Sequence, residues 1–178
     1  MIPDWMTSAP RPFDTVLVAN RGEIAVRVLR AAKESGLRGV AVYSDPDTGS
    51  LHVENADQAV HLPGTTLADT YLNGDAIIEA ARSTGAQAIH PGFGFLSERA
   101  DFANAVKAAG LIWIGPPVDA IDTMGDKISA RRCMIESGVP VIPGEEISMG
   151  GDSDHLGVLA AAAARVGYPL LLKASAGG

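Results

Sequence analysis

Thr15-Val16-Leu17-Val18-Ala19 is followed by Asn20-Arg21-Gly22 and then by apolar residues at helical spacing as far as Ser35. The first run indicates a buried strand, and the spacing that follows indicates a helix that ends at Gly36. A strand that leads directly into a helix is the unit from which parallel sheets are built. This stretch therefore predicts an α/β fold.

The same alternation continues along the chain. Further strands are expected at 39–43, 58–62, 88–90 and 111–114, and further helices at 74–84 and 98–109. Repeated units of this kind predict a Rossmann-like, mostly parallel sheet with helices on both of its faces. An acidic, turn-rich connection separates the second and third strands.

The pattern changes after Met124, where we place a domain boundary. Residues 1–12 are expected to be a loose extension, 13–125 a first domain and 126–178 the first part of a second one. In the second part we expect helices at 127–137, capped by Asp126, and from 154 through 164, with short strands at 141–142 and 170–172. Ser175–Gly178 resembles the start of a glycine-rich hairpin that lacks its return strand, so we expect the chain to be an N-terminal piece of a longer protein.

Composition restricts the class of protein. The 178 residues are 47% hydrophobic and 20% charged, which excludes overall disorder. A net charge of −7 argues against general affinity for nucleic acid, and the absence of a long apolar run argues against membrane insertion. Cys133 is the single cysteine, which excludes an intrachain disulfide and favours the cytoplasm; helix packing is its expected role.

The loop after the expected strand at 88–90 is the strongest candidate for a binding site. It reads His90-Pro91-Gly92-Phe93-Gly94-Phe95-Leu96-Ser97-Glu98, with two glycines around one aromatic residue. Glycine lets the backbone approach a bound group closely, and a loop this apolar at the carboxyl end of a strand is typical of a pocket wall.

Two lysines could contact a phosphate. Lys173 follows three leucines and precedes small residues and glycines, so either a phosphate contact or a solvated strand end explains it. Lys127 follows an expected helix N-cap, where a solvated surface is the simpler interpretation and an anion contact the alternative. Together the two lysines could bracket a polyphosphate.

Other known motifs are missing or weak. The turn after the first strand has Gly22 but lacks Gly-x-Gly-x-x-Gly, which argues against a nicotinamide-binding dehydrogenase, and no P-loop motif occurs. The histidines are not spaced as a metal site. One side of the first helix carries Arg27, Arg30 and Glu34. From their spacing alone, a solvated face is the better interpretation and a subunit interface the less favoured one.

Four stretches together resemble biotin carboxylase, in order and at matching intervals. They are Val18-Ala19-Asn20-Arg21-Gly22-Glu23-Ile24-Ala25, His90 to Glu98, Met124-Gly125-Asp126-Lys127 and Lys173-Ala174-Ser175-Ala176-Gly177-Gly178. The resemblance covers the chain from about Phe13 and is nearest to the alpha chain of acetyl- or propionyl-CoA carboxylases.

This resemblance implies a pre-ATP-grasp domain followed by the start of an ATP-grasp domain. It implies a ligase that uses ATP, Mg²⁺ and bicarbonate to carboxylate biotin through carboxyphosphate. By the same resemblance, Lys127, Lys173, Gly177 and Gly178 contact ATP, and Gly94 lies against biotin. A homodimer interface on the face of Arg27, Arg30 and Glu34, a biotin carrier domain and a carboxyltransferase subunit are also implied.

The family's magnesium ligands, catalytic base and orienting arginines fall outside these 178 residues. We therefore assign no catalytic or metal-binding residue to the chain, and we expect the piece by itself to be inactive. Two alternatives stay open: another ATP-grasp ligase of the carbamoyl-phosphate or purine-pathway type, and a non-catalytic dimerisation module. The acceptor of the carboxyl group is not encoded in this stretch.

Overall fold

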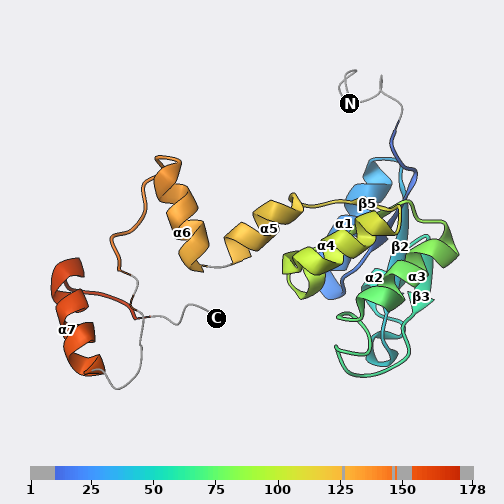
Figure 1. Cartoon of the computed structure of the whole chain (residues 1–178). Helices are drawn as coiled ribbons and strands as arrows, with labels where there is room; N and C mark the ends of the chain where they lie inside the picture. Colours follow the sequence, from blue (N-terminus) through green and yellow to red (C-terminus); the bar gives the residue numbers. More distant parts are fainter. Residues whose placement is uncertain (1–10, 126, 146, 148–153, 173–178) are drawn as a thin grey trace. The chain divides into compact units, whose positions relative to one another are not determined.

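The computed structural model describes residues 11–125, 127–145, 147 and 154–172. The chain divides into two compact units, residues 1–121 and 122–178. In the first unit, five strands form one sheet: β1 (Thr15–Val18), β2 (Arg38–Tyr43), β3 (Gln58–His61), β4 (Ala88–His90) and β5 (Ile112–Trp113). Their order across the sheet is β3-β2-β1-β4-β5, and all neighbouring pairs are parallel. Figure 1 labels β2, β3 and β5 of this sheet. The predicted parallel sheet is confirmed.

The helices of the first unit follow its strands. The three long ones are α1 (Gly22–Glu34), α3 (Gly74–Thr84) and α4 (Ala100–Ala108). Shorter pieces occur at η2 (Asp45–Asp47), α2 (Leu51–Glu54) and η3 (Phe95–Glu98). The sequence pattern predicts the long helices to within about two residues at most of their ends. It does not predict η2 and α2, which lie in the connection expected to be a turn-rich loop.

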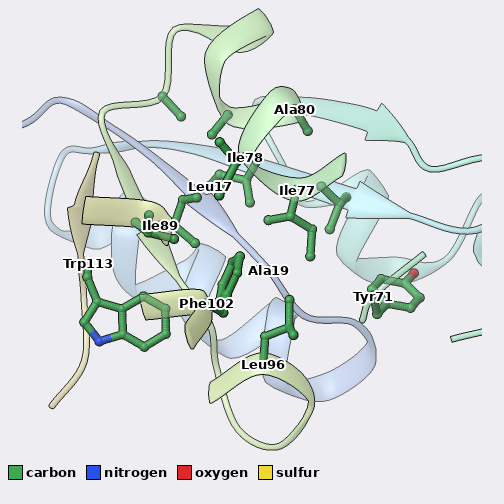
Figure 2. Close-up of a cluster of buried hydrophobic side chains, with 14 of the residues drawn as sticks. Leu17, Ala19, Tyr71, Ile77, Ile78, Ala80, Ile89, Leu96, Phe102 and Trp113 are labelled. Carbon is green, nitrogen blue, oxygen red and sulfur yellow. The ribbon is translucent and has the colours of Figure 1, made fainter. Parts of the chain in front are cut away.

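Alternate residues of β1 serve the two faces of the sheet, because side chains of a strand point to opposite sides in turn. Leu17 belongs to the main core with Ile77 of α3 and Phe102 of α4 (Figure 2). Val18 packs in a separate cluster with Ala25 and other residues of α1. All these side chains are buried. Helices therefore cover both faces of the sheet, as predicted.

The second unit contains helices α6 (Lys127–Glu136) and α7 (His155–Val166), while α5 (Val118–Gly125) spans the boundary between the units. The predicted cap at Asp126 lies outside the described residues. Among the described residues, none of the helices has both the length and the apolar character to cross a bilayer. The domain limits at 12 and 125 stay predictions.

The two strands expected in the second unit are absent from its described part. At 141–142 the backbone carbonyl of Ile142 accepts a hydrogen bond of 2.6 Å from Arg131, which also contacts the carbonyl of Gly144. Residues 170–172 are exposed and have no strand partner among the described residues. Both strand predictions rested on apolar residues alone, and an apolar run becomes a strand only when a neighbouring strand satisfies its backbone.

Candidate functional site

The loops that follow β1 and β4 lie side by side at the carboxyl edge of the sheet. Val18 is in register with His90, and the backbone N–H of Ala19 donates to the carbonyl of His90 at 2.8 Å. The strand order reverses between β1 and β4, since β2 and β3 lie on one side of β1 and β5 lies beyond β4. Ligands of open α/β sheets bind outside the carboxyl ends of strands at such a reversal.

The side chain of Asn20 joins the two loops. It is 2% exposed, and its Nδ2 donates to the carbonyls of Pro91 at 2.8 Å and Phe93 at 2.9 Å. Its Oδ1 accepts a hydrogen bond of 2.9 Å from the backbone N–H of Arg21. Both amide N–H groups and the amide oxygen are therefore used within the two loops.

The loop after β4 is shaped by its glycines. Gly92 and Gly94 have φ angles of +73° and +67°. A Cβ at Gly92 would lie 2.6 Å from Nδ2 of Asn20, whereas a Cβ at Gly94 would meet no heavy atom within 4 Å. Gly92 is thus needed for close packing. The backbone at Gly94 is open, and Phe93 between them is 75% exposed.

His90 begins this loop with its imidazole partly buried. Its Nδ1 accepts a hydrogen bond of 3.0 Å from the backbone N–H of Gly92. Burial lowers the pKa of His90. The neutral ring therefore carries its proton on Nε2, because Nδ1 is the acceptor.

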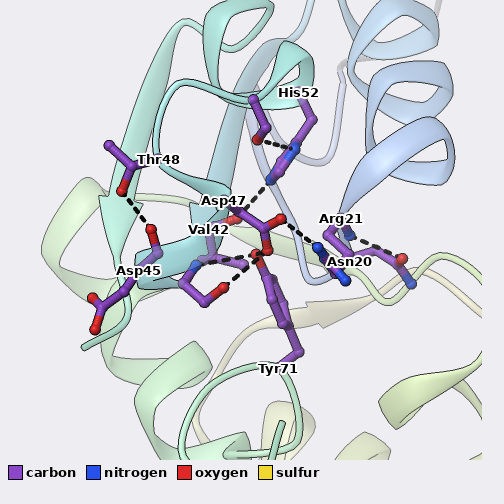
Figure 3. A network of polar contacts seen from close by, with 10 residues as sticks. Asn20, Arg21, Val42, Asp45, Asp47, Thr48, His52 and Tyr71 are labelled. Carbon is purple, nitrogen blue, oxygen red and sulfur yellow. Dashed lines mark hydrogen bonds and ion pairs between the residues drawn. The ribbon is translucent and has the colours of Figure 1, made fainter. Parts of the chain in front are cut away.

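A second cluster of polar side chains, the Asp47 network, lies where β2 ends (Figure 3). It consists of Arg21, Ser44, Asp47 and Tyr71. The Asp47 carboxylate accepts hydrogen bonds from the Arg21 guanidinium, from Ser44 Oγ at 2.9 Å and from the Tyr71 hydroxyl at 2.6 Å. The Tyr71 hydroxyl in turn accepts the backbone N–H of Ser44 at 3.1 Å.

The charges of the Asp47 network follow from these contacts. Burial by itself would raise the pKa of Asp47, but the hydrogen bonds from Arg21, Tyr71 and Ser44 together outweigh it and lower that pKa. The hydrogen bond to Asp47 raises the pKa of Arg21. Burial, together with the hydrogen bond to Asp47, raises the pKa of Tyr71. At neutral pH the network therefore contains one ion pair and a neutral phenol.

Tyr71 connects the Asp47 network to the loop after β4. Its ring stacks on the ring of Phe95, with centroids 5.5 Å apart and an angle of 10° between the planes. Phe95 follows Gly94 and has a φ of +48°, which is unfavourable for a residue with a side chain. The Arg21 guanidinium lies 5.7 Å from the centre of the Tyr71 ring. The stack therefore holds a strained residue next to Gly94.

His52 has a structural role beside this network. It is 1% exposed, and its ring lies between the carbonyl of Val42, 3.2 Å from Nε2, and the hydroxyl of Ser50, 2.8 Å from Nδ1. Since a carbonyl only accepts, Nε2 carries the proton and Nδ1 accepts from Ser50. Burial lowers the pKa of His52, so the ring stays neutral.

The predicted site residues are spread over both units. Gly94 lies in the loop described above, and Arg27, Arg30 and Glu34 are exposed on α1. Arg30 and Glu34 form an ion pair of 3.9 Å, with side chains 71% and 72% exposed. Lys127 is the first residue of α6. The remaining three, Lys173, Gly177 and Gly178, lie outside the described residues.

Among the described residues, neither a cluster of metal ligands nor the depression beside α3 and α4 adds to this site. Within the described ranges, no group of three or more His, Cys, Asp or Glu side chains could hold a metal ion. An open depression of about 400 Å³ lies beside the first turns of α3 and α4, lined among others by Asn73, Asp75, Arg99 and Phe102. It includes none of the predicted site residues.

The residues of the first unit match a known family. The family described as "Biotin carboxylase, N-terminal domain" matches residues 12–121. The chain belongs to this family. The resemblance found in the four sequence stretches is thereby confirmed.

Longer relatives contain a segment similar to this biotin carboxylase N-terminal domain. The chain is 53% identical over 165 residues to the mitochondrial methylcrotonoyl-CoA carboxylase subunit alpha of Oryza sativa subsp. japonica, covering 93% of the chain and 22% of that protein. It is 47% identical over 166 residues to the biotin carboxylase of Halalkalibacterium halodurans, covering 93% and 36%. The chain therefore spans about a fifth to just over a third of the length of these relatives.

Solved structures of longer proteins are also similar to this chain. The biotin carboxylase domain dimer of Hydrogenobacter thermophilus 2-oxoglutarate carboxylase, in complex with MgADP, ADP and bicarbonate, has a TM-score of 0.82 at 44% identity, covering 95% of the chain and 36% of that structure. The Kluyveromyces lactis urea amidolyase has a TM-score of 0.73 at 53% identity, covering 75% and 8%.

The sequence indicates the loop of Gly94 as a binding site but does not indicate the partners that hold this loop. Asn20 belongs to the turn after the first strand and to the first of the four stretches that resemble biotin carboxylase, but neither gives its side chain a role. Asp47 and Tyr71 were given no role, because neither lies in a periodic pattern or a known motif. The available signal was a polar Asn20 directly after five buried residues, 15–19, because a buried amide requires hydrogen-bond partners.

Proposed function

We propose that this biotin carboxylase N-terminal domain acts as part of an ATP-dependent biotin carboxylase. In this reaction ATP and bicarbonate give carboxyphosphate and ADP; the carboxyl group then passes to a ring nitrogen of biotin, which loses its proton, and phosphate is released. The observation that carries the proposal is the loop after β4, which the family match includes. Its Gly94 offers open backbone at the strand reversal, where a flat ring could approach closely.

ATP would bind through residues of the second unit. We propose Lys127, Lys173, Gly177 and Gly178 as its contacts. Lys127 opens α6, where the first backbone N–H groups have no partner within the helix and favour an anion. The nucleotide, magnesium and bicarbonate bound in the H. thermophilus structure support these ligands for the family. The magnesium ligands would lie outside this chain.

The relatives differ in the acceptor that their names give. They include methylcrotonoyl-CoA and propionyl-CoA carboxylase alpha chains and urea amidolyase. We propose an acyl-CoA carboxylase alpha chain, working with a biotin carrier domain and a carboxyltransferase subunit. A homodimer through the α1 face of Arg27, Arg30 and Glu34 is proposed as well, supported by the dimer named for the H. thermophilus domain. The predicted compartment remains the cytoplasm.

The test is bicarbonate-dependent ATP cleavage by the full-length protein that carries this chain, with and without free biotin. We expect biotin to stimulate cleavage. Lys127→Ala and Lys173→Ala should raise KM for ATP at least tenfold, because each removes a cation from the polyphosphate. Lys107→Ala, which removes an exposed lysine of α4, is the matched control and should leave KM for ATP unchanged.

Two outcomes would contradict the proposal. ATP cleavage indifferent to biotin would favour another ATP-grasp ligase. A dimer without any affinity for ATP would favour a dimerisation module. The 178-residue chain alone should cleave no ATP, and biotin-dependent turnover by it would contradict that expectation.

A further inference from the structure

Asn20 contacts both ends of the loop segment that leads to Gly94. Its Nδ2 donates to the carbonyl of Pro91, just before Gly92, at 2.8 Å and to the carbonyl of Phe93, just before Gly94, at 2.9 Å. A single nitrogen thus fixes the Pro91–Gly92 and Phe93–Gly94 peptide groups, which lie on either side of the Gly92–Phe93 pair. The side chain is 2% exposed, so water does not compete for these bonds.

The loop needs such an external constraint. Glycine populates left-handed and right-handed backbone conformations about equally, and only Phe93 separates Gly92 from Gly94. The sequence of the loop therefore leaves several conformations open. The donor of Asn20 favours the one conformation in which both carbonyls point at it, and a Cβ at position 92 would lie only 2.6 Å from Nδ2, which keeps larger residues out.

We infer that Asn20 is a positioning residue for the biotin site, because its amide sets the backbone conformation that presents Gly94. The inference rests on the function proposed above. Asn20 itself is buried and acts through the loop rather than by touching the substrate. Beyond Gly94, the stack of Phe95 on Tyr71 holds the loop independently. Loss of the amide should therefore displace residues 91–94 without unfolding the unit.

The test compares two isosteric substitutions in the full-length protein, Asn20→Asp and Asn73→Asp. At position 20 the change turns the donor Nδ2 into an oxygen that faces two carbonyls. At position 73 the side chain caps α3 by accepting the N–H of Ala76 at 3.1 Å, and its amide nitrogen lies 3.5 Å from the carbonyl of Asp69. Aspartate caps helices as well as asparagine does, so this control has the same change of charge with little change in structure.

Two readouts separate positioning from general destabilisation. In bicarbonate-dependent ATP cleavage, Asn20→Asp should raise KM for free biotin at least tenfold and leave KM for ATP within twofold. Hydrogen exchange should become at least tenfold faster at the amides of residues 92–95 and stay unchanged in β2 and α3. Asn73→Asp should match the wild type in both. If Asn20→Asp does not fold, Asn20→Ala removes the donor without adding a charge and should show the same selectivity.

Three results would overturn the inference. Equal increases in the two KM values would mean general destabilisation, and an unchanged KM for biotin would mean that the loop keeps its position without the amide. Wild-type ATP cleavage that ignores biotin would overturn the proposed function and the biotin part of the inference with it. The exchange rates would then decide separately whether Asn20 fixes the loop.

Discussion

Replacing Tyr71 by phenylalanine removes one oxygen from the Asp47 network and leaves the ring in place. The ring is 1% exposed and stacks on Phe95, so the substitution should keep the packing. What it loses is the 2.6 Å hydrogen bond to the Asp47 carboxylate and the acceptor for the backbone N–H of Ser44.

The magnitude follows from these two contacts. A hydrogen bond to a charged group contributes about 1.5–3 kcal/mol, and a buried N–H left without a partner costs about 1–3 kcal/mol more. Because Asp47 keeps its bonds from Arg21 and Ser44, we take the lower half of each range and expect a loss of about 3 kcal/mol in the free energy of unfolding. With a urea dependence of about 2 kcal/mol per molar, the midpoint should fall by about 1.5 M.

The assay is equilibrium unfolding of the 178-residue chain in urea, followed by the fluorescence of Trp113. This side chain is 9% exposed and donates to the carbonyl of Pro116 at 3.1 Å, so it reports on the first unit. Trp5 is the other tryptophan and is replaced by phenylalanine in every variant. Tyr43→Phe is the control, since the hydroxyl of Tyr43 has no hydrogen-bond partner in the described part of the chain. A loss from Tyr71→Phe no larger than that from the control would refute this account of the network.

Three more predictions concern backbone, charge and association. Gly92→Ala should destabilise the fold more than Gly110→Ala in thermal unfolding. Both positions have positive φ, which costs an alanine about 1 kcal/mol, but only at Gly92 does the new Cβ collide with its neighbours, which adds about 1–3 kcal/mol. Equal losses of stability in the two variants would contradict this. The pKa of Asp47 is lowered in the folded state, so its ionised form stabilises the fold above the unfolded pKa of about 4, and this is lost as pH falls through the folded pKa. The difference in free energy of unfolding between wild type and Asp47→Asn should therefore become smaller as the pH falls from 6 to 3. A difference that stays constant would contradict the stabilising role of the ionised Asp47. Arg30→Glu should weaken self-association of the full-length protein at least tenfold in sedimentation experiments. It should change the free energy of unfolding by less than about 1 kcal/mol, because the ion pair of Arg30 with Glu34 is exposed. Unchanged association would show that this face of α1 is not part of the interface.

Periodicity predicted the parts of the fold that are built from repeated contacts. The alternation of strand and helix gave the five strands and the long helices, since each buried face imposes its own spacing on the sequence. It failed at η2 and α2, because Asp47 is buried by Arg21 and Tyr71, which lie 26 and 24 residues away. Such a contact leaves no periodic signal near Asp47.

The candidate site was predictable only where its chemistry is local. The two glycines of the loop after β4 indicate an unusual backbone by themselves, and the resemblance to biotin carboxylase then assigns Gly94 to the biotin site, an assignment that stays a prediction. Asn20 gave no comparable signal, since asparagine at the end of a strand most often forms a turn. Its partners Pro91 and Phe93 are 71 and 73 residues away, and only the folded sheet brings them together.

The strand order also has a consequence for the time at which the protein can fold. β1 lies between β2, which follows it closely in the chain, and β4, which is made some 70 residues later. During synthesis, the hydrogen-bonding edge of β1 that faces β4 must wait until residues near 90 have left the ribosome. An apolar strand with one open edge invites pairing with other chains. We therefore expect a nascent chain stopped before β4 to aggregate, and one that extends past β5, so that both edges of β4 are paired, to stay soluble.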